Sequence, residues 1–201
     1  MAHTIKPNDA QHYFVPADEV LALLSPQVAS TAALEELLTS VALPETFFNA
    51  PTEKVDIETS WRILNAHYNM ANEESHNLSQ RPLVRGTTRF IFSNILHCTH
   101  LHHALQTIAQ TYNVIHGGEF NFVKTRGKNL TFIVDDQNFH YTGKASVLAV
   151  EYALLRIHCA LSFLAKRPLH IQRVGTPRFR TTIITLKCLA HRLMLARKRI
   201  A

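Results

Sequence analysis

The chain has 201 residues, of which 46% are hydrophobic and 18% charged, a composition that can bury a core and that excludes collagen-like, low-complexity and disordered classes. It has no apolar run long enough to span a membrane, no secretory leader at its start, and three widely spaced cysteines rather than a disulfide framework, so we expect a cytoplasmic protein without a membrane partner. The formal net charge is +6, but it is unevenly distributed: residues 1–80 carry a net −8, whereas 81–175 and 176–201 each carry +7. Such a division is typical either of a basic half that binds nucleic acid or of acidic and basic layers that pack on each other.

The first third of the chain is dominated by helical spacing of apolar residues. Residues 1–15 are rich in proline and polar residues and predict a flexible arm. Helices are predicted over 18–24, over 31–41 and over 57–72, each bounded by serine, threonine or proline. In the last of these helices, Trp61 belongs to the apolar face, which makes it a candidate for the core or for a ligand pocket.

The rest of the chain combines helices with short strands. Its apolar spacing predicts, in chain order, helices over 90–96 and 101–112, strands over 120–123 and 130–134, a long helix over 145–165 and a strand over 169–174. Thr99 is the expected N-cap of the second helix, and Arg126–Asn129 is the expected hairpin turn. The order of elements predicts an α+β fold, with a helical N-terminal half followed by a small antiparallel sheet and a long central helix.

Histidine is concentrated in one short run, from His97 to His103, which also holds a cysteine. Histidine and cysteine bind zinc and copper, but a site needs three or four converging ligands. On a helix His100 and His103 share a face, and a complete site would need a further ligand such as His116 or His158. The alternative is a polar helix start with exposed imidazoles, and we expect no metal and no other cofactor.

Other constellations give little sign of catalysis. The sequence has no Gly-x-Ser-x-Gly motif and no glycine-rich phosphate loop, so we expect that the chain is not an enzyme. The adjacent acids Glu73 and Glu74 would point in different directions, which is typical of a solvated turn rather than an acid–base pair. Arg81, Arg85 and Arg89 recur at intervals of four, which suits either the binding of a carboxylate or phosphate or pairing with the acidic first third.

Several motifs stand in an order that is typical of one protein family. They are Leu37–Pro44 with its apolar-proline turn, Trp61–Ala66, Arg81–Tyr112, and Arg167–Leu169 before a strand that leads to Pro177. In this order, the stretch from Ala32 to about Val174 resembles the N-terminal effector domain of AraC-type bacterial transcriptional regulators, in the branch labelled arabinose-binding. The resemblance implies an α+β sensor domain that binds a small effector or dimerises, and that controls a C-terminal helix-turn-helix domain. Effectors vary within the branch, so the resemblance does not imply a sugar.

After Pro177 the sequence departs from this family, which continues with a Phe-Gly-x-Pro-Val step and a later asparagine. Residues 178–201 instead form a tail with seven basic residues and no acid, which predicts a basic amphipathic helix. We favour the hypothesis that the tail is frameshift-derived, because moving the reading frame back by one base recovers the family's residues at the family's spacing. The shift can change Leu189 to Phe, Ala190 to Gly, Arg192 to Pro, Leu193 to Val and Ile200 to Asn.

The first hypothesis for function is therefore a truncated AraC-type regulator in which residues 16–177 form the effector-binding and dimerisation domain. Its expected partners are a small-molecule effector and a second copy of the chain. The pocket is expected to draw on Trp61, Tyr112 and Arg156, which are chosen for chemistry and helix face rather than carried over from the family. Aromatic side chains supply apolar walls, and a guanidinium can clamp a carboxylate.

Two alternatives stay open. The chain could be a small basic nucleic-acid-binding protein acting through its tail, or a metal-binding protein using His100 and His103. Because no recognition helix is present, we expect no sequence-specific DNA binding by this chain alone. Any binding to DNA should rest on phosphate contacts of the tail and should weaken steeply with salt.

Overall fold

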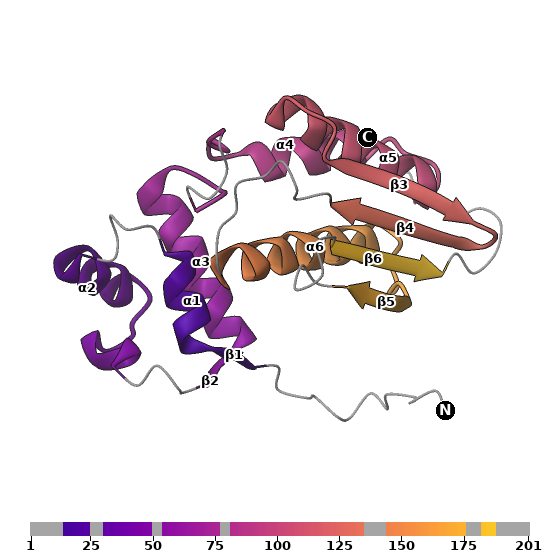
Figure 1. Cartoon of the computed structure of the whole chain (residues 1–201). Helices are drawn as coiled ribbons and strands as arrows, with labels where there is room; N and C mark the ends of the chain where they lie inside the picture. The colour runs from indigo at the N-terminus through magenta and orange to yellow at the C-terminus, as the bar shows by residue number, and fades with distance from the viewer. Residues whose placement is uncertain are drawn as a thin grey trace, which may run out of the picture. The chain divides into compact units, whose positions relative to one another are not determined.

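In the computed structural model the chain divides into two units, residues 1–71 and 72–201. The structure describes residues 14–24, 30–49, 54–76, 81–134, 144–175 and 182–187, and Figure 1 traces its helices and strands. The sequence predicts one domain over 16–177, whereas the contacts between residues divide the chain between Ala71 and Asn72. Among the described helices, none is long and apolar enough to cross a membrane.

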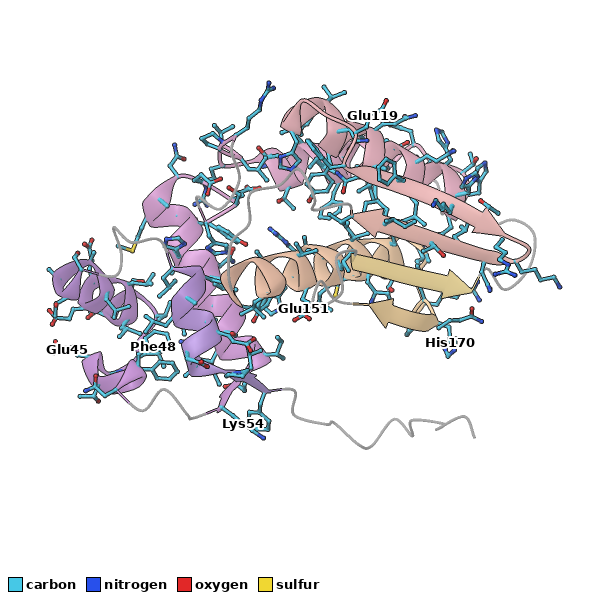
Figure 2. The ribbon with its side chains drawn as sticks, viewed as in Figure 1. Glu45, Phe48, Lys54, Glu119, Glu151 and His170 are labelled. Atoms are coloured by element: carbon cyan, nitrogen blue, oxygen red, sulfur yellow. The ribbon has the colours of Figure 1, made fainter. Side chains whose placement is uncertain are left out.

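The first unit consists of helices and one short pair of strands. Strand β1 (Phe14–Pro16) pairs antiparallel with β2 (Lys54–Asp56), so the last residues of the predicted arm belong to a strand, while residues 1–13 lie outside the described part. The helices are α1 (Ala17–Leu23), α2 (Thr31–Ser40), the 3-10 helix η1 (Glu45–Phe48) and α3 (Ile57–Ala71). Figure 2 shows Phe48 between η1 and α1, with Glu45 at the edge of the unit.

Helix α3 begins where a carboxylate accepts a backbone hydrogen bond. Oδ1 of Asp56 accepts the N–H of Thr59 at 2.9 Å, which satisfies one of the free donors at the helix N-terminus. The same hydrogen bond from the backbone of Thr59 stabilises the charged carboxylate and lowers the pKa of Asp56.

The second unit joins helices to a four-stranded antiparallel sheet. The strands stand in the order β3-β4-β6-β5 and are β3 (Asn121–Arg126), β4 (Asn129–Val134), β5 (Ile171–Gly175) and β6 (Thr182–Lys187). The helices are α4 (Thr87–Asn94), α5 (Leu101–His116) and α6 (Lys144–Leu164). The predicted α+β fold, with helices first and then a small antiparallel sheet beside a long helix, is confirmed.

The hairpin between β3 and β4 follows the predicted turn. Arg126 pairs with Asn129, which leaves a two-residue loop. Gly127 in this loop has a φ of +59°, a left-handed conformation that glycine adopts without steric cost.

Strand β6 lies within the predicted basic tail and differs from the expected helix. Residues Thr182–Lys187 pair with β4 on one side and with β5 on the other, so Leu186 is part of a strand. The segment is rich in β-branched residues, which favour strands, and two neighbouring strands satisfy its backbone groups. Residues 188–201 lie outside the described part of the chain.

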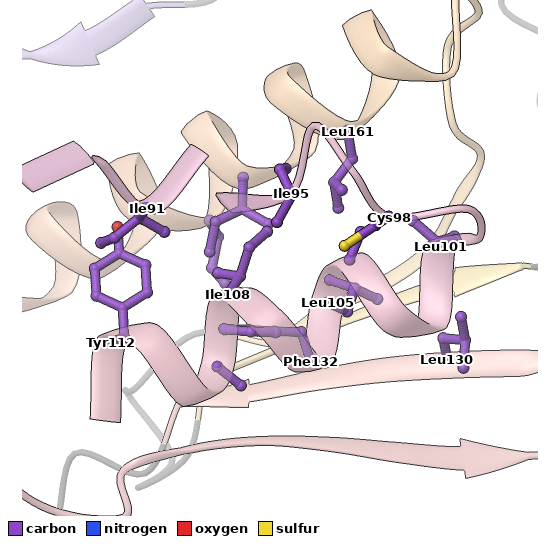
Figure 3. Packing of buried hydrophobic residues seen from close by; sticks show 14 of the residues in the cluster. Ile91, Ile95, Cys98, Leu101, Leu105, Ile108, Tyr112, Leu130, Phe132 and Leu161 are labelled. Atoms are coloured by element: carbon purple, nitrogen blue, oxygen red, sulfur yellow. The ribbon is translucent and has the colours of Figure 1, made fainter. Parts of the chain in front are cut away.

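The core of the second unit lies between its helices and the sheet. Figure 3 shows Ile91 of α4, Ile108 of α5, Phe132 of β4 and Leu161 of α6 in this cluster. Near its C-terminal end the long helix α6 has one buried and one exposed face: Leu161 is 1% exposed, whereas Phe163 is 82% exposed. The apolar pattern of the long helix predicts Leu154, Leu155 and Leu161 in the core; Leu154 and Leu161 are buried, whereas Leu155 is half-buried.

Candidate functional site

A cavity of about 70 Å³ lies within the second unit, bordered by α5, α6, the hairpin strands β3 and β4, and the chain around residues 74–76. This volume holds several water molecules or a small organic group. Most of its surface is apolar, although seven of the fifteen lining residues carry a polar group. This is the usual composition of a small-molecule site.

One wall of the cavity is a face of α6 with small side chains. Ala149, Ala153 and Arg156 are spaced by four and three residues, so they follow one another along the helix. The two alanines leave room beside the guanidinium, and Leu154 and Ile157 extend the wall with larger aliphatic groups.

A second wall comes from the C-terminal end of α5. Tyr112 and His116 stand one helical turn apart, and their rings are stacked with centroids 5.9 Å apart and an interplanar angle of 9°. Just beyond them, Gly117 caps the helix with a φ of +74°, and a side chain at this position would collide with the guanidinium of Arg81. Arg81 therefore lies against the C-terminal end of α5, where the helix dipole favours a cation.

The hairpin end of the cavity is fixed by one asparagine of α5. Oδ1 of Asn113 accepts hydrogen bonds from the backbone N–H groups of Phe120 and Asn121 at 3.0 and 2.8 Å. Its Nδ2 donates to the carbonyl of Asn121 at 2.9 Å. Because Asn121 pairs with Val134 across the hairpin, these bonds hold both cavity-lining residues to α5.

The segment before α4 is organised by a buried carboxylate. Glu73 is 4% exposed, and its Oε1 accepts the N–H groups of Ser75 and Leu83 at 2.8 and 2.7 Å and the hydroxyl of Ser75. The expectation of a solvated turn is therefore wrong at Glu73, whereas Glu74 is half-buried. Backbone N–H groups two and ten positions further along the chain satisfy the buried carboxylate.

The neighbouring acid caps α4 from outside the helix. Oε1 and Oε2 of Glu74 accept the N–H groups of Gly86 and Thr88 at 2.6 and 2.7 Å. The N-cap residue Gly86 has no side chain to do this, and α4 has no acid in its first turn. Nη1 of Arg156 lies 3.4 Å from Oγ1 of Thr88, so Arg156 reaches the same helix start from the cavity.

Burial keeps the two rings of α5 neutral. It raises the pKa of the Tyr112 phenol, an effect that the positive charge of Arg156 opposes and the negative charge of Glu74 increases. Burial, together with the positive charge of Arg81, lowers the pKa of His116 to about 4. At neutral pH the cavity therefore presents an uncharged phenol and an uncharged imidazole.

The structure brings together two of the three expected pocket residues. Tyr112 and Arg156 both line the cavity, from α5 and α6. Trp61 is half-buried on α3, in the first unit, and does not belong to this lining. Of the three arginines at intervals of four, Arg81 and Arg85 precede α4, which begins at Thr87, and only Arg89 is helical.

The histidine run leads into helix α5. His100, not Thr99, is the N-cap of α5, and its Nδ1 accepts the N–H of His103 at 3.1 Å. His158 is bonded to the carbonyl of Leu169 at 2.9 Å. Within the described residues, no group of three or more histidine, cysteine, aspartate or glutamate side chains could hold a metal ion.

No family model matches the chain, and no curated protein or solved structure matches it either. The family resemblance expected from the sequence order therefore stays a prediction.

The neutral state of His116 makes the stability depend on pH. Its pKa is about 4 in the folded protein and 6.5 ordinarily, so between these values the unfolded chain binds a proton that the folded protein does not. Its contribution to the free energy of unfolding is therefore fully present above pH about 6.5 and is lost as the pH falls towards about 4. Urea unfolding at pH 7 and pH 5 should show a larger loss for wild type than for His116→Gln; equal losses would contradict a buried neutral imidazole.

Proposed function

We propose that the second unit binds a small molecule in this cavity and acts as the effector-binding domain of an AraC-type regulator. The observation that carries the proposal is that Tyr112 and Arg156, distant in sequence and selected for their chemistry, line one cavity. The resemblance in segment order supplies the regulatory context. A binding role also suits the neutral Tyr112 and His116, which offer hydrogen bonds without placing further charge in an apolar space.

The cavity suits recognition by few but fixed polar groups. Glu74 is held by two backbone donors, Asn121 is held through Asn113, and Tyr112 is stacked on His116. A ligand would meet side chains that are already in place, which lowers the entropic cost of binding. Three expectations from the sequence stay predictions: that the chain dimerises, that it does not bind DNA sequence-specifically, and that it is not an enzyme.

Native mass spectrometry of the full chain purified from its host tests the proposal. Wild type should retain a small molecule, and Ala153→Leu should lose it because the added carbons fill the space beside Arg156. The control is Ala32→Leu, which adds the same atoms to an exposed position on α2. A retained molecule that Ala153→Leu keeps as well as wild type does would place binding elsewhere and contradict the proposal.

A further inference from the structure

We propose that the ligand of this cavity is a small carboxylic acid with a short apolar body, bound through its carboxylate to the guanidinium of Arg156. This inference rests on the proposed function and specifies the chemical class of the effector.

One cation reaches the cavity directly. Arg156 belongs to the lining, together with one carboxylate, that of Glu74. Beyond the lining, Arg81 lies beside His116, and the buried carboxylate of Glu73 accepts hydrogen bonds from the backbone of two lining residues. The guanidinium of Arg156 is therefore the group of the lining that can hold an anion.

The carboxylate of Glu74 is already engaged by backbone groups at the start of α4. Each of its oxygens already accepts a backbone N–H at the start of α4, at 2.6 and 2.7 Å. Glu74 therefore neutralises the helix N-terminus and orders the residues next to Arg156 rather than offering a free carboxylate to a bound cation.

A carboxylate can form stronger hydrogen bonds with Arg156 than the hydroxyl of Thr88 on α4 does. The guanidinium is 3.4 Å from the hydroxyl of Thr88, which is long for a hydrogen bond. A carboxylate accepts two parallel N–H groups of an arginine at shorter distances, and such charge-assisted bonds are about twice as strong as neutral ones. The phenol of Tyr112, held neutral by burial, can donate a further hydrogen bond.

The apolar part of the lining determines the size and polarity of the rest of the ligand. Along α6 the lining next to Arg156 in sequence includes Ala149 and Ala153, and β4 contributes Phe132 and Val134. Burial of an apolar ligand surface against aliphatic and aromatic side chains lowers the free energy of binding. A volume of about 70 Å³ restricts that body to a short or branched chain.

Calorimetric titration of the full chain with isovalerate and with its neutral analogue isovaleramide tests the inference. Wild type should bind isovalerate at least tenfold more tightly than the amide, the difference expected for one hydrogen bond to a charged group. Arg156→Gln should remove this preference. Arg156→Lys keeps the positive charge but not the two parallel N–H donors of the guanidinium, so it should keep part of the preference. The matched control is Arg85→Gln, because Arg85 is exposed and outside the lining.

The possible failures are distinguishable. Equal binding of acid and amide, both lost in Ala153→Leu, would overturn the carboxylate and leave the proposed function intact. If inorganic phosphate binds as tightly as isovalerate, the site recognises any anion, and the inference that the ligand has an apolar body is overturned. A preference for isovalerate that Arg156→Gln retains would overturn the role of Arg156. The unfolding free energy of each variant without ligand shows whether it is folded.

Discussion

Replacing Leu161 with alanine should lower the free energy of unfolding by about 2–5 kcal/mol, the range found for buried leucines. Leu161 is 1% exposed and lies in the cluster that joins α4, α5, α6 and the sheet. The truncation removes apolar surface from a packed interior and leaves a space that the surrounding helices fill only in part. Denaturant unfolding monitored by circular dichroism measures the change.

The same helix offers a matched control for this substitution. Phe163 is 82% exposed and two residues away, so Phe163→Ala should change the free energy of unfolding by less than about 0.5 kcal/mol. A loss at position 163 as large as that at position 161 would show that the face of α6 that carries Phe163 is buried as well.

Replacing Glu73 with alanine should cost about 2–5 kcal/mol of unfolding free energy. The change removes the acceptor of the Ser75 and Leu83 N–H groups and of the Ser75 hydroxyl, and each buried donor without a partner costs about 1–3 kcal/mol. Glu73→Gln keeps one carbonyl oxygen in place and should cost less. Thermal and urea unfolding give the two values.

The exposed acid of the same unit provides the control for Glu73. Glu119→Ala should be nearly neutral, since this side chain is exposed at the start of the hairpin, as Figure 2 shows. A cost below about 0.5 kcal/mol for Glu73→Ala would mean that the segment before α4 does not depend on this carboxylate.

The helices could be predicted from sequence because their signal is local. Apolar residues at intervals of three and four place the long helix at 145–165, and the structure has it at Lys144–Leu164. The pair β1–β2 could not be predicted in this way, because three-residue strands have almost no periodicity and their partners lie about forty residues apart. The strand β6 was expected as part of a helix because its few apolar residues also fit helical spacing.

The candidate site could be predicted only in part. Tyr112 and Arg156 combine suitable chemistry with a position on apolar helix faces, which a sequence displays. Glu74 was missed because its role depends on partners twelve and fourteen residues further along, Gly86 and Thr88. A signal was nevertheless present: a helix that starts at a glycine, with no acid in its first turn, needs an acceptor from elsewhere.

The histidine run shows how one local signal can have two explanations. Thr99 is the better N-cap by residue type, but the ring nitrogen of His100 takes that role and so uses one of the two histidines of the metal hypothesis. Sequence spacing alone does not distinguish a ligand from a cap.

The most direct test of the cavity as a ligand site is an NMR titration of the full chain, labelled at its alanine methyl groups, with isovalerate. We expect saturable shifts of the Ala149 and Ala153 methyl signals, which line the cavity, while the exposed Ala22 and Ala32 of the first unit stay unchanged. Saturable shifts at Ala22 or Ala32 without any at Ala149 and Ala153, or no saturable shift at about 10 mM ligand, where even weak millimolar binding would be detected, would contradict the assignment of this cavity as the binding site.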